Sequence, residues 1–205
     1  MVSEPLTAAD RLEAAGVVAR AFRDNPGIVA VAGPSHEDER LRLLTIAIPF
    51  FVETTLRYGV GEVIREAGKI VAVSLATQPG GYPLPLLGRW LTTRGALAAG
   101  VRRALRFGRI DDEMRRRHPR YRHWYLWFLA VDPPHQGRGL GSMLLRSLSQ
   151  KAERDGVPCY LETDKVSSVR LYEKHGYKVS SEHVIGGLEL RLWFMERPAS
   201  PAGEP

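Results

Sequence analysis

Hydrophobic residues recur every three or four positions through much of the first part of the chain. This spacing predicts a helix from Ala8 to Arg23 and a second helix from His36 to about Tyr58. Between them, Asn25-Pro26-Gly27 predicts a break, because proline and glycine are poor helix formers. Pro49 lies inside the second helix and predicts a kink there, since proline cannot donate a backbone hydrogen bond.

A hairpin and a less regular segment follow. Two runs, Val60 to Ile64 and Ile70 to Ala76, flank Ala67-Gly68 and predict a β-hairpin. Residues 78–122 begin with a stretch rich in glycine and proline, and we interpret this segment as a helical insertion or lid. Its pattern predicts two helices, around Leu86 to Phe107 and around Asp111 to Arg117.

The pattern is clearest in the second half of the chain. Trp124 to Val131 is a continuous apolar run of strand length, which is typical of a strand buried on both faces. The elements predicted after it are a helix from Gly139 to Arg154, a strand from Pro158 to Thr163, a short helix from Val166 to His175, and strands from Tyr177 to Val184 and Leu188 to Met195. This order predicts an α/β fold in which helices cover a mixed sheet.

The segment Gln136-Gly137-Arg138-Gly139-Leu140-Gly141-Ser142 lies between a predicted strand and a predicted helix. Free backbone N–H groups at a helix N-terminus bind anions, and glycines let a ligand approach the backbone closely, so a pyrophosphate would fit. The alternative is a turn that simply needs small residues. A P-loop is excluded because no lysine follows Gly141, and the G-x-G-x-G spacing departs from the dinucleotide fingerprint, although Glu162 lies about 20 residues downstream.

Composition narrows the classes further. The 205 residues are 44% hydrophobic and 25% charged, which is ordinary globular usage and excludes a wholly disordered or fibrous chain. No apolar run approaches the ~18 residues of a membrane span, and the N-terminus lacks the pattern of a signal peptide, so we expect a cytoplasmic protein with no membrane partner. We expect one domain over residues 1–197 and a disordered tail over residues 198–205.

Charge and cysteine content add little to this picture. The net charge of +6 favours anionic partners, and the arginines between Arg102 and Arg117 are the densest basic stretch. That stretch lacks interleaved aromatic residues, and we interpret it as a solvated helix face rather than a nucleic-acid site. The single Cys159 excludes an intramolecular disulfide, and no spacing of Cys, His, Asp or Glu resembles a metal site.

Two stretches carry a family resemblance. The stretch LAVDPPHQGRGLGSMLL resembles the acetyl-coenzyme A signature of the GNAT family of N-acetyltransferases, whose pattern Q/R-x-x-G-x-G/A is supplied by Gln136, Gly139 and Gly141. Further on, LETDKVSSVRLYEKHGYKV is similar to the family's second landmark, a tyrosine (Tyr172) followed by Gly176-Tyr177. The resemblance covers residues 124–184, extends more weakly to residues 6–26, and is absent from the insertion.

The resemblance implies a fold and a coenzyme site. The fold would be a mixed, mostly antiparallel sheet with a splayed strand pair, helices on both faces and a helical insertion before the fourth main strand. Acetyl-CoA would be the co-substrate, with no metal. Ser168 stands where family members often have asparagine, and its hydroxyl could substitute. The residues implied in coenzyme binding are Leu129, Ala130 and Val131 along the pantetheine arm, and Gln136, Gly137, Arg138, Gly139, Leu140, Gly141 and Ser142 around the pyrophosphate.

The resemblance also assigns roles in chemistry. Tyr172 would be the general acid, and a backbone N–H near Ala130 or Val131 would polarise the thioester carbonyl. The general base stays open: Glu162, which could equally be structural, Glu53 and His123 are candidates by residue type alone. Residues expected to contact the acceptor are Phe22, Asn25, Glu162 and Trp127, the last because strand alternation gives it the same side as Tyr125 and Leu129.

We therefore expect an N-acetyltransferase that moves an acetyl group from acetyl-CoA directly to a primary amine. The insertion, together with Tyr82, Trp90, Trp124 and Trp127, suits an enclosed small-molecule acceptor. Acceptors on a protein N-terminus or lysine, a longer acyl group, and a non-catalytic acyl-CoA-binding regulator remain as alternatives. A homodimer is a state that the family commonly adopts, and nucleic-acid binding ranks last.

Overall fold

The computed structural model describes residues 2–199, so most of the predicted tail, from residue 200 onward, lies outside the described residues. The helices are α1 (Arg11–Phe22), α2 (Pro26–Ala32), α3 (Glu37–Tyr58), α4 (Leu86–Ala98), α5 (Val101–Arg117), α6 (Leu140–Asp155) and α7 (Val166–Glu173). The strands are β1 (Glu4–Pro5), β2 (Val60–Glu66), β3 (Lys69–Thr77), β4 (Trp124–Val131), β5 (Cys159–Thr163), β6 (Lys178–Ile185) and β7 (Leu190–Arg197).

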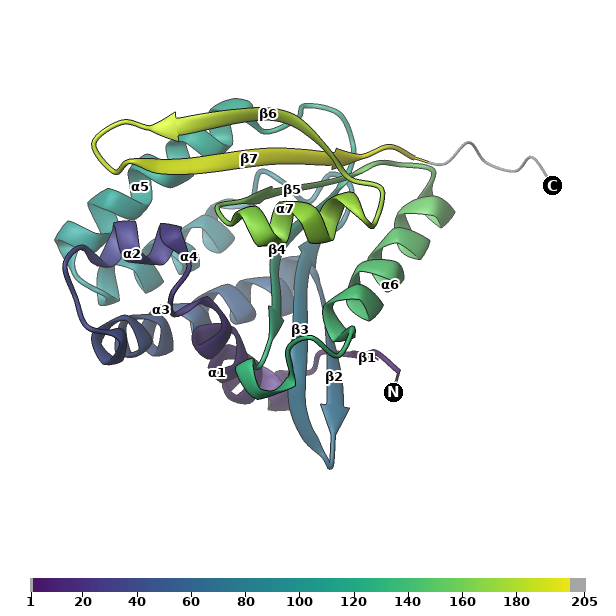
Figure 1. Cartoon of the computed structure of the whole chain (residues 1–205), viewed down its shortest axis with the longest axis horizontal. Helices are drawn as coiled ribbons and strands as arrows, with labels where there is room; N and C mark the ends of the chain where they lie inside the picture. Colours follow the sequence, from purple (N-terminus) through teal and green to yellow (C-terminus); the bar gives the residue numbers. More distant parts are fainter. Residues whose placement is uncertain (1, 200–205) are drawn as a thin grey trace.

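The strands of this described part form one mixed sheet in the order β1-β2-β3-β4-β5-β7-β6 (Figure 1). β4 and β5 run parallel, and the other neighbouring strands pair antiparallel. A parallel pair needs a crossover connection, and α6 supplies it between β4 and β5. The predicted fold class, a mostly antiparallel mixed sheet in an α/β protein, is confirmed.

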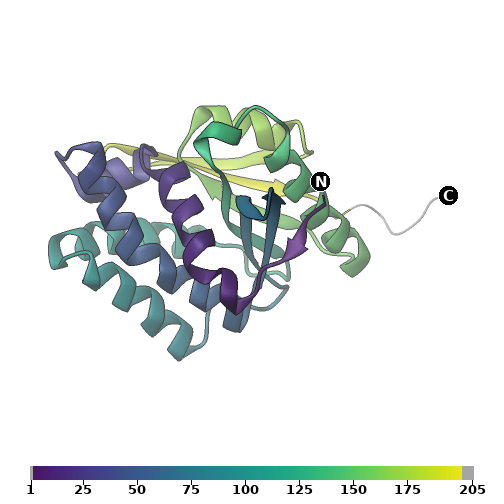
Figure 2. The ribbon, with the colours of Figure 1, turned by 90° about the horizontal axis from the view of Figure 1, so that it is seen from below.

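Helices cover both faces of the sheet (Figure 2). On one face, α1 and α3 pack their apolar residues against β2, β3 and β4, and α2 and α5 pack against the strands nearer the C-terminus. On the other face, α6 and α7 cover residues such as Ile64, Ala72, Leu161 and Met195. Because both faces are covered, β3 is buried over nearly its whole length, as its continuous apolar sequence requires.

At Trp127, β4 separates from β5 and the alternation of its side chains between the two faces of the sheet is interrupted. The two strands pair from Trp124–Cys159 to Leu126–Leu161 and separate beyond, which is the predicted splay. At the same level a β-bulge interrupts the register of β4 with β3, because Ala76 pairs with Leu126 and Leu75 pairs with Phe128. Trp127 is the extra residue between them.

The bulge overturns the expected side of Leu129. An extra residue shifts the alternation by one, so Trp127 and Phe128 lie on the same face, where their ring centroids are 6.4 and 5.6 Å from that of Phe51. Leu129 instead packs on the α6 face beside Leu140. The prediction that Trp127 shares a face with Tyr125 is correct, but its extension to Leu129 is wrong, since simple alternation takes no account of a bulge.

Two further elements differ from their predictions. The break at Asn25-Pro26-Gly27 is also the start of α2, with Pro26 in the first helical turn, where a proline costs no hydrogen bond. In the insertion, the boundary between the helices lies at Gly100, whose φ of 110° ends the helical path, and not near residue 108. The prediction missed this because glycine inside a helical pattern does not by itself mark a break.

Asp10 fastens the N-terminal segment to the sheet. Its carboxylate accepts hydrogen bonds from the Thr7 backbone N–H at 2.9 Å and from Arg65 on β2 at 2.5 Å. Burial by itself raises the pKa of the Asp10 carboxyl, but the hydrogen bonds from Arg65 and Thr7 outweigh it and leave that pKa below its ordinary value. The ionised form is therefore the one that stabilises the fold.

This arrangement predicts how stability depends on acid. Since the folded-state pKa of Asp10 is depressed, its contribution is present above about pH 4 and is lost as the pH falls through the folded value. Asp10→Asn should lower the free energy of unfolding near neutral pH by about 1–2 kcal/mol and make its decline toward low pH shallower. Urea unfolding at a series of pH values measures both, with the exposed Glu173→Gln as control. An unchanged acid limb in the Asp10 variant would contradict this assignment.

Candidate active site

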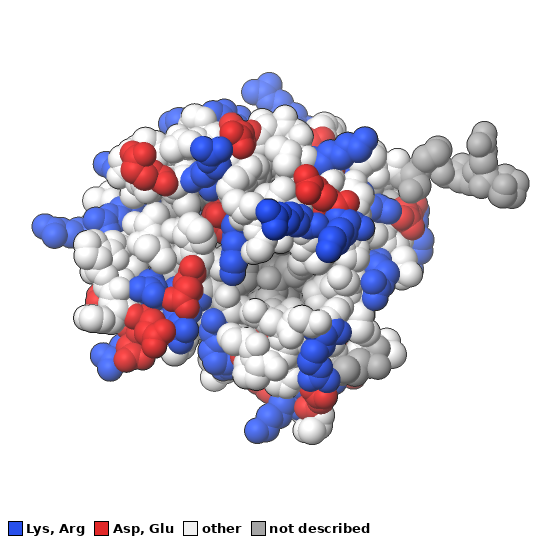
Figure 3. All heavy atoms as spheres, viewed as in Figure 1, with Lys and Arg blue, Asp and Glu red and all other residues white. Residues whose placement is uncertain are grey.

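A cavity of about 690 Å³ opens where β4 and β5 separate. It extends from the glycine-rich segment before α6, past α7, to the aromatic residues of α1, α5 and β4. Figure 3 shows a hollow near the centre of this face, bordered by Lys and Arg side chains. Residues far apart in the sequence thus line one continuous space, which is the usual form of a binding site for a small ligand.

The glycine-rich segment forms one end of the cavity. Gly137 and Gly139 have φ values of 76° and 79°, a left-handed conformation that favours glycine, and Gly139 is the N-cap of α6. Backbone N–H groups of the first helical turn have no partner within the helix, and they lie beside the cavity at Leu140, Gly141 and Ser142. The donors and the helix dipole fit a diphosphate.

Gln136 and Arg138 hold this segment in place. The Gln136 side chain donates to the Val131 carbonyl at 3.0 Å, which ties the segment to the end of β4. The Arg138 guanidinium makes two hydrogen bonds of 2.8 Å to Glu66 at the end of β2, and Arg138 does not line the described cavity. Its expected contact with a pyrophosphate stays a prediction.

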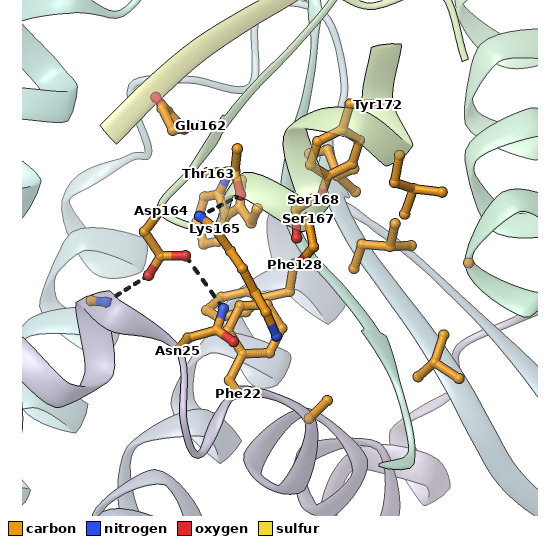
Figure 4. Close-up of a pocket in the computed structure, with 18 of the residues that line it drawn as sticks. Phe22, Asn25, Phe128, Glu162, Thr163, Asp164, Lys165, Ser167, Ser168 and Tyr172 are labelled. Carbon is orange, nitrogen blue, oxygen red and sulfur yellow. Dashed lines mark hydrogen bonds between the residues drawn. The ribbon is translucent and has the colours of Figure 1, made fainter. Parts of the chain in front are cut away.

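The sequence analysis missed the lysines that border the cavity. Lys165 and Lys174 flank α7 and line the cavity, and Figure 4 shows the Lys165 side chain extending toward Phe22 and Asn25. The available signal was their position at the two ends of the short helix that carries Tyr172. Both bring positive charge to the cavity.

Of the three residues predicted on β4 to bind the coenzyme, two have side chains that line the cavity and one does not. Leu129 and Val131 line the cavity, whereas the Ala130 side chain is buried against α1 and α3. Ala130 can therefore contribute only its backbone, which is the role the sequence assigned to it. Ser142 also lines the cavity, and its hydroxyl lies 2.8 Å from His175 Nε2.

Ser168 and Tyr172 lie one helical turn apart on α7 and both line the cavity (Figure 4). Tyr172 is 8% exposed, and its ring lies 5.7 Å from that of Tyr177. Burial, with a smaller contribution from Asp164, raises the pKa of the Tyr172 hydroxyl above its ordinary value. The hydroxyl therefore stays protonated at neutral pH, as a proton donor must.

The opposite end of the cavity is aromatic and apolar. Phe22 and Phe128 meet edge to face with centroids 5.3 Å apart, and Phe107 and Trp127 complete the lining. The bulge at Trp127 is what places Trp127 and Phe128 together here. The predicted acceptor residues Phe22 and Trp127 are thus brought into one chamber, which we call the aromatic chamber (Phe22, Phe107, Trp127 and Phe128).

Asp164 fixes the entrance of this chamber. Its carboxylate accepts a hydrogen bond of 2.6 Å from the Gly27 backbone N–H and one of 3.4 Å from the Asn25 side chain (Figure 4). These contacts fasten the start of α2 to the segment between β5 and α7. Asn25, a predicted acceptor residue, therefore lines the cavity while serving in this attachment. Asp164 itself was not predicted.

The candidate bases occupy three different environments. Glu162 lines the cavity, and its carboxylate points away from Tyr172 (Figure 4), with Oε1 3.8 Å from His118 Nδ1. His123 is buried, and its Nε2 lies 3.0 Å from His118 Nε2. Glu53 pairs with Arg57 on α3 at 2.7 Å and does not line the described cavity.

Other aromatic candidates lie elsewhere. Trp90 is 53% exposed on α4, and Trp124 packs on the α6 side, where its indole donates to Asp155 at 2.8 Å. Neither lines the described cavity, which corrects their expected place beside the acceptor. Trp124 precedes Tyr125 on β4, so strand alternation places it on the face opposite Tyr125 and Trp127. Tyr82 stacks on His118, behind the chamber.

The described residues hold neither a candidate metal site nor a candidate membrane span. Residues 2–199 contain no group of three or more His, Cys, Asp or Glu side chains arranged to hold a metal ion. Across the same residues, no helix combines the length and apolar character that crossing a bilayer requires.

Comparison with known proteins identifies the family. Residues 90–177, a little under half of the chain, match the model of the acetyltransferase (GNAT) family. This stretch holds α5 as well as the glycine-rich segment, β5 and α7, so the match extends into the insertion, where the sequence stretches carried no resemblance. Over these residues the chain matches the GNAT family. The recognition made from the two sequence stretches is confirmed, and so is the enzyme class, an acyltransferase.

Individual relatives are distant. An uncharacterized N-acetyltransferase of Schizosaccharomyces pombe is 24% identical over 186 residues, covering 86% of this chain and 74% of that protein. A Corynebacterium glutamicum structure, described as a histone acetyltransferase and related acetyltransferase, is 21% identical with a TM-score of 0.65 over 98% of each chain. Arylalkylamine N-acetyltransferase 2 of Aedes aegypti is 16% identical, with a TM-score of 0.66 over 97% of this chain and 98% of that one. At these identities the structural likeness establishes the GNAT fold alone.

The geometry of the GNAT glycine-rich segment predicts opposite effects for two alanine substitutions. Gly139→Ala forces a side chain into a left-handed conformation and should lower the free energy of unfolding by about 1–2 kcal/mol. Gly141 lies inside α6, where an added Cβ would make ordinary contacts at 3.7 and 3.8 Å with Val131 and Leu129. Gly141→Ala should therefore leave stability unchanged or raise it by up to about 1 kcal/mol. Urea unfolding measures both, and an equal loss in the two variants would contradict the described loop conformation.

Proposed function

We propose that this GNAT protein transfers an acetyl group from acetyl-CoA directly to the primary amine of a small molecule with an apolar or aromatic body. The observation that carries the proposal is the continuity of the cavity. One space joins the anion-binding segment at Gly137 to Ser142 with the aromatic chamber, across the gap between β4 and β5. A two-substrate transfer needs such a passage, because the two substrates must meet without an intervening wall.

The gap between β4 and β5 suits an extended arm with amide groups. Strands that separate leave backbone N–H and C=O groups on β4 without their neighbour, and buried backbone groups need partners. The pantetheine arm of acetyl-CoA carries amides that would pair with the backbone of Leu129 to Val131. Its diphosphate would then reach the first turn of α6.

The chemistry would require few side chains. The neutral amine nitrogen attacks the thioester carbonyl carbon, a C–N bond forms, and the C–S bond breaks. The amine loses a proton to a base, and the departing thiolate takes a proton from the Tyr172 hydroxyl, so that the net products are an amide and a free thiol. The position of Tyr172 in the cavity lining supports this role, and its hydroxyl is protonated at neutral pH, as a proton donor must be. Burial raises the pKa of this hydroxyl and so makes it a weaker acid, which means that the transfer depends on a thiolate forming beside it.

The chamber supports a small acceptor that combines an apolar body with a cationic or basic group. Its walls are mainly aromatic and aliphatic. Glu162 and Asp164 bring carboxylates to its edge, and the Lys165 side chain extends toward it from the start of α7. An apolar body would pack on the rings, and the carboxylates favour an amine over an anionic group. A protein N-terminus or lysine is the alternative acceptor, and it would have to enter as an extended segment past α2. We also propose that residues 1–197 form a single acetyltransferase domain and that residues 78–122 are a helical insertion in it.

Coenzyme binding is the first test. Isothermal titration with acetyl-CoA should give saturable binding to the unsubstituted protein. A variant carrying Gly139→Glu and Gly141→Glu should lose that binding, because two carboxylates would stand where the diphosphate is expected. Gly108→Glu with Gly186→Glu adds the same charge at glycines whose added Cβ meets no described atom within 4 Å, and should bind normally. Absence of binding to the folded, unsubstituted protein would overturn the proposal.

The role of Tyr172 is tested by removing one oxygen. Tyr172→Phe should lower kcat for release of free thiol by about 100-fold, since the thiolate loses its proton donor. The Kd for acetyl-CoA should stay within about threefold, because the ring remains in place. Tyr177→Phe is the matched control, as it removes a buried hydroxyl from the neighbouring ring. Equal activity of the Tyr172 variant and the control would exclude the hydroxyl as the acid.

A further inference from the structure

A buried chain of a carboxylate and two imidazoles lies behind the aromatic chamber. Glu162 is the first residue of β5 beyond its pairing with β4, and it lines the cavity with a side chain that is 4% exposed. His118, just after α5, has a side chain that is 6% exposed, and its Nδ1 lies 3.8 Å from Glu162 Oε1. His118 Nε2 in turn lies 3.0 Å from Nε2 of His123.

The contacts of His123 determine which nitrogens carry protons. Nδ1 of His123 lies 2.7 Å from the Tyr121 carbonyl oxygen, which can only accept, so His123 Nδ1 carries the proton. Burial lowers the pKa of His123, which keeps that ring neutral and leaves a lone pair on its Nε2. His118 Nε2 must therefore donate to His123, and the lone pair of a neutral His118 lies on Nδ1, facing Glu162.

With His118 Nε2 donating to His123, Nδ1 of His118 is left as a proton acceptor that faces Glu162. Glu162 Oε1 is buried and makes no hydrogen bond to His118, and the hydroxyls of Tyr125 and Tyr160 lie near the Glu162 carboxylate. A His118 whose lone pair faces Glu162 can accept a proton that Glu162 has taken up. The 3.8 Å separation is longer than a hydrogen bond, and the two groups would have to approach when the substrates bind.

We propose that Glu162 is the base that takes the proton of the acceptor amine, and that His118, held in one tautomer by His123, takes that proton from Glu162. This inference rests on the proposed function. Glu162 would contact the amine, whereas His118 and His123 act through Glu162 and are positioning residues. The insertion, which supplies His118, thereby contributes to the chemistry as well as to the walls.

The proton balance of the step is closed. The amine N–H bond breaks as a Glu162 O–H bond forms, and this proton passes to His118 Nδ1 while His118 keeps its Nε2–H bond to His123. The product is an imidazolium next to a carboxylate, which is a neutral pair overall. When the amide and the thiol leave, the pair returns the proton to water in the opened cavity and the Tyr172 phenolate takes a proton from water, so all three side chains recover their starting forms.

The rings of Tyr82, Tyr125 and Tyr160 enclose His118, with centroids 3.8, 4.7 and 5.0 Å from that of His118. Burial raises the pKa of each of these three hydroxyls, so none of them titrates near neutral pH. The remaining ionisable groups of this region are Asp111 and Arg115 of α5, beyond Tyr82, and Tyr121 and Glu196, beside His123.

The kinetic test removes the proton acceptor but keeps a ring. His118→Phe retains an aromatic group against Tyr82 and should lower kcat/KM for a strongly basic amine at neutral pH by about 100-fold. The KM for acetyl-CoA should be unchanged. The loss should shrink toward wild-type activity for an amine whose ammonium pKa lies well below the assay pH, because such an amine arrives neutral. It should also shrink as the pH rises. His36→Phe, at an exposed position, is the matched control.

The outcomes separate the two proposals. A loss of kcat/KM in His118→Phe that is larger for more basic amines supports the relay. Glu162→Gln should show the same dependence on amine basicity. Equal loss for all amines would mean that His118 is structural and would overturn the relay while leaving the transferase intact. Failure of the unsubstituted protein to bind acetyl-CoA would overturn the proposed function and the relay together.

A spectroscopic test needs neither substrate nor a folded variant. Long-range ¹H–¹⁵N correlation on the full chain reports which imidazole nitrogen carries the proton. In the protein without added acetyl-CoA, we expect His123 protonated on Nδ1 and His118 protonated on Nε2. A neutral His118 protonated on Nδ1 would leave no lone pair toward Glu162 and would contradict the relay.

Discussion

The separation of β4 from β5 beyond Leu126 and Leu161 is the constraint from which the site follows. Two parallel strands that stay paired leave no room for a ligand between them, whereas two that diverge leave backbone donors and acceptors available in a narrow gap. Each buried backbone group that finds no partner costs about 1–3 kcal/mol, so the open gap favours a ligand that supplies amide partners. The bulge at Trp127 marks the level of this divergence and, on the same strand, turns two aromatic rings toward the chamber.

The helices around the gap are attached by few but specific contacts. Asp164 accepts the Gly27 N–H at 2.6 Å and so joins α2 to the β5–α7 segment across the mouth of the chamber. Burial raises the pKa of Asp164, although the hydrogen bond from Gly27 opposes that shift. Gln136 makes a comparable attachment on the coenzyme side, through the Val131 carbonyl. The two ends of the cavity are thus positioned by side-chain contacts to backbone groups, which fix geometry without filling the space.

The sequence allowed the glycine-rich end of the cavity to be predicted and left much of its aromatic end undetermined. The conformation of Gly139 and its place at the start of α6 restrict the residue types there enough to be recognised in a sequence. The mostly antiparallel sheet and its splayed strand pair followed from the same resemblance, whereas the strand order did not. The side of Leu129 did not, because a bulge of one residue leaves no mark in an apolar run such as WYLWFLAV. Asp164 and His118 were missed because their partners lie far away in sequence, on α2 and on β5.

This division has a physical cause. The coenzyme end depends on backbone groups from one continuous stretch, so substitutions of side chains disturb it little. The acceptor end is assembled from side chains of α1, α2, α5 and β4, which meet only in the folded chain. Phe107, Ile110 and Met114 on α5 form one wall, yet α5 contributes nothing to the glycine-rich segment. Changes on α2 and α5 can therefore alter the shape and charge of the chamber while the coenzyme end keeps its geometry. For that reason we expect the acceptor to be selected by α2 and α5 rather than by the glycine-rich segment.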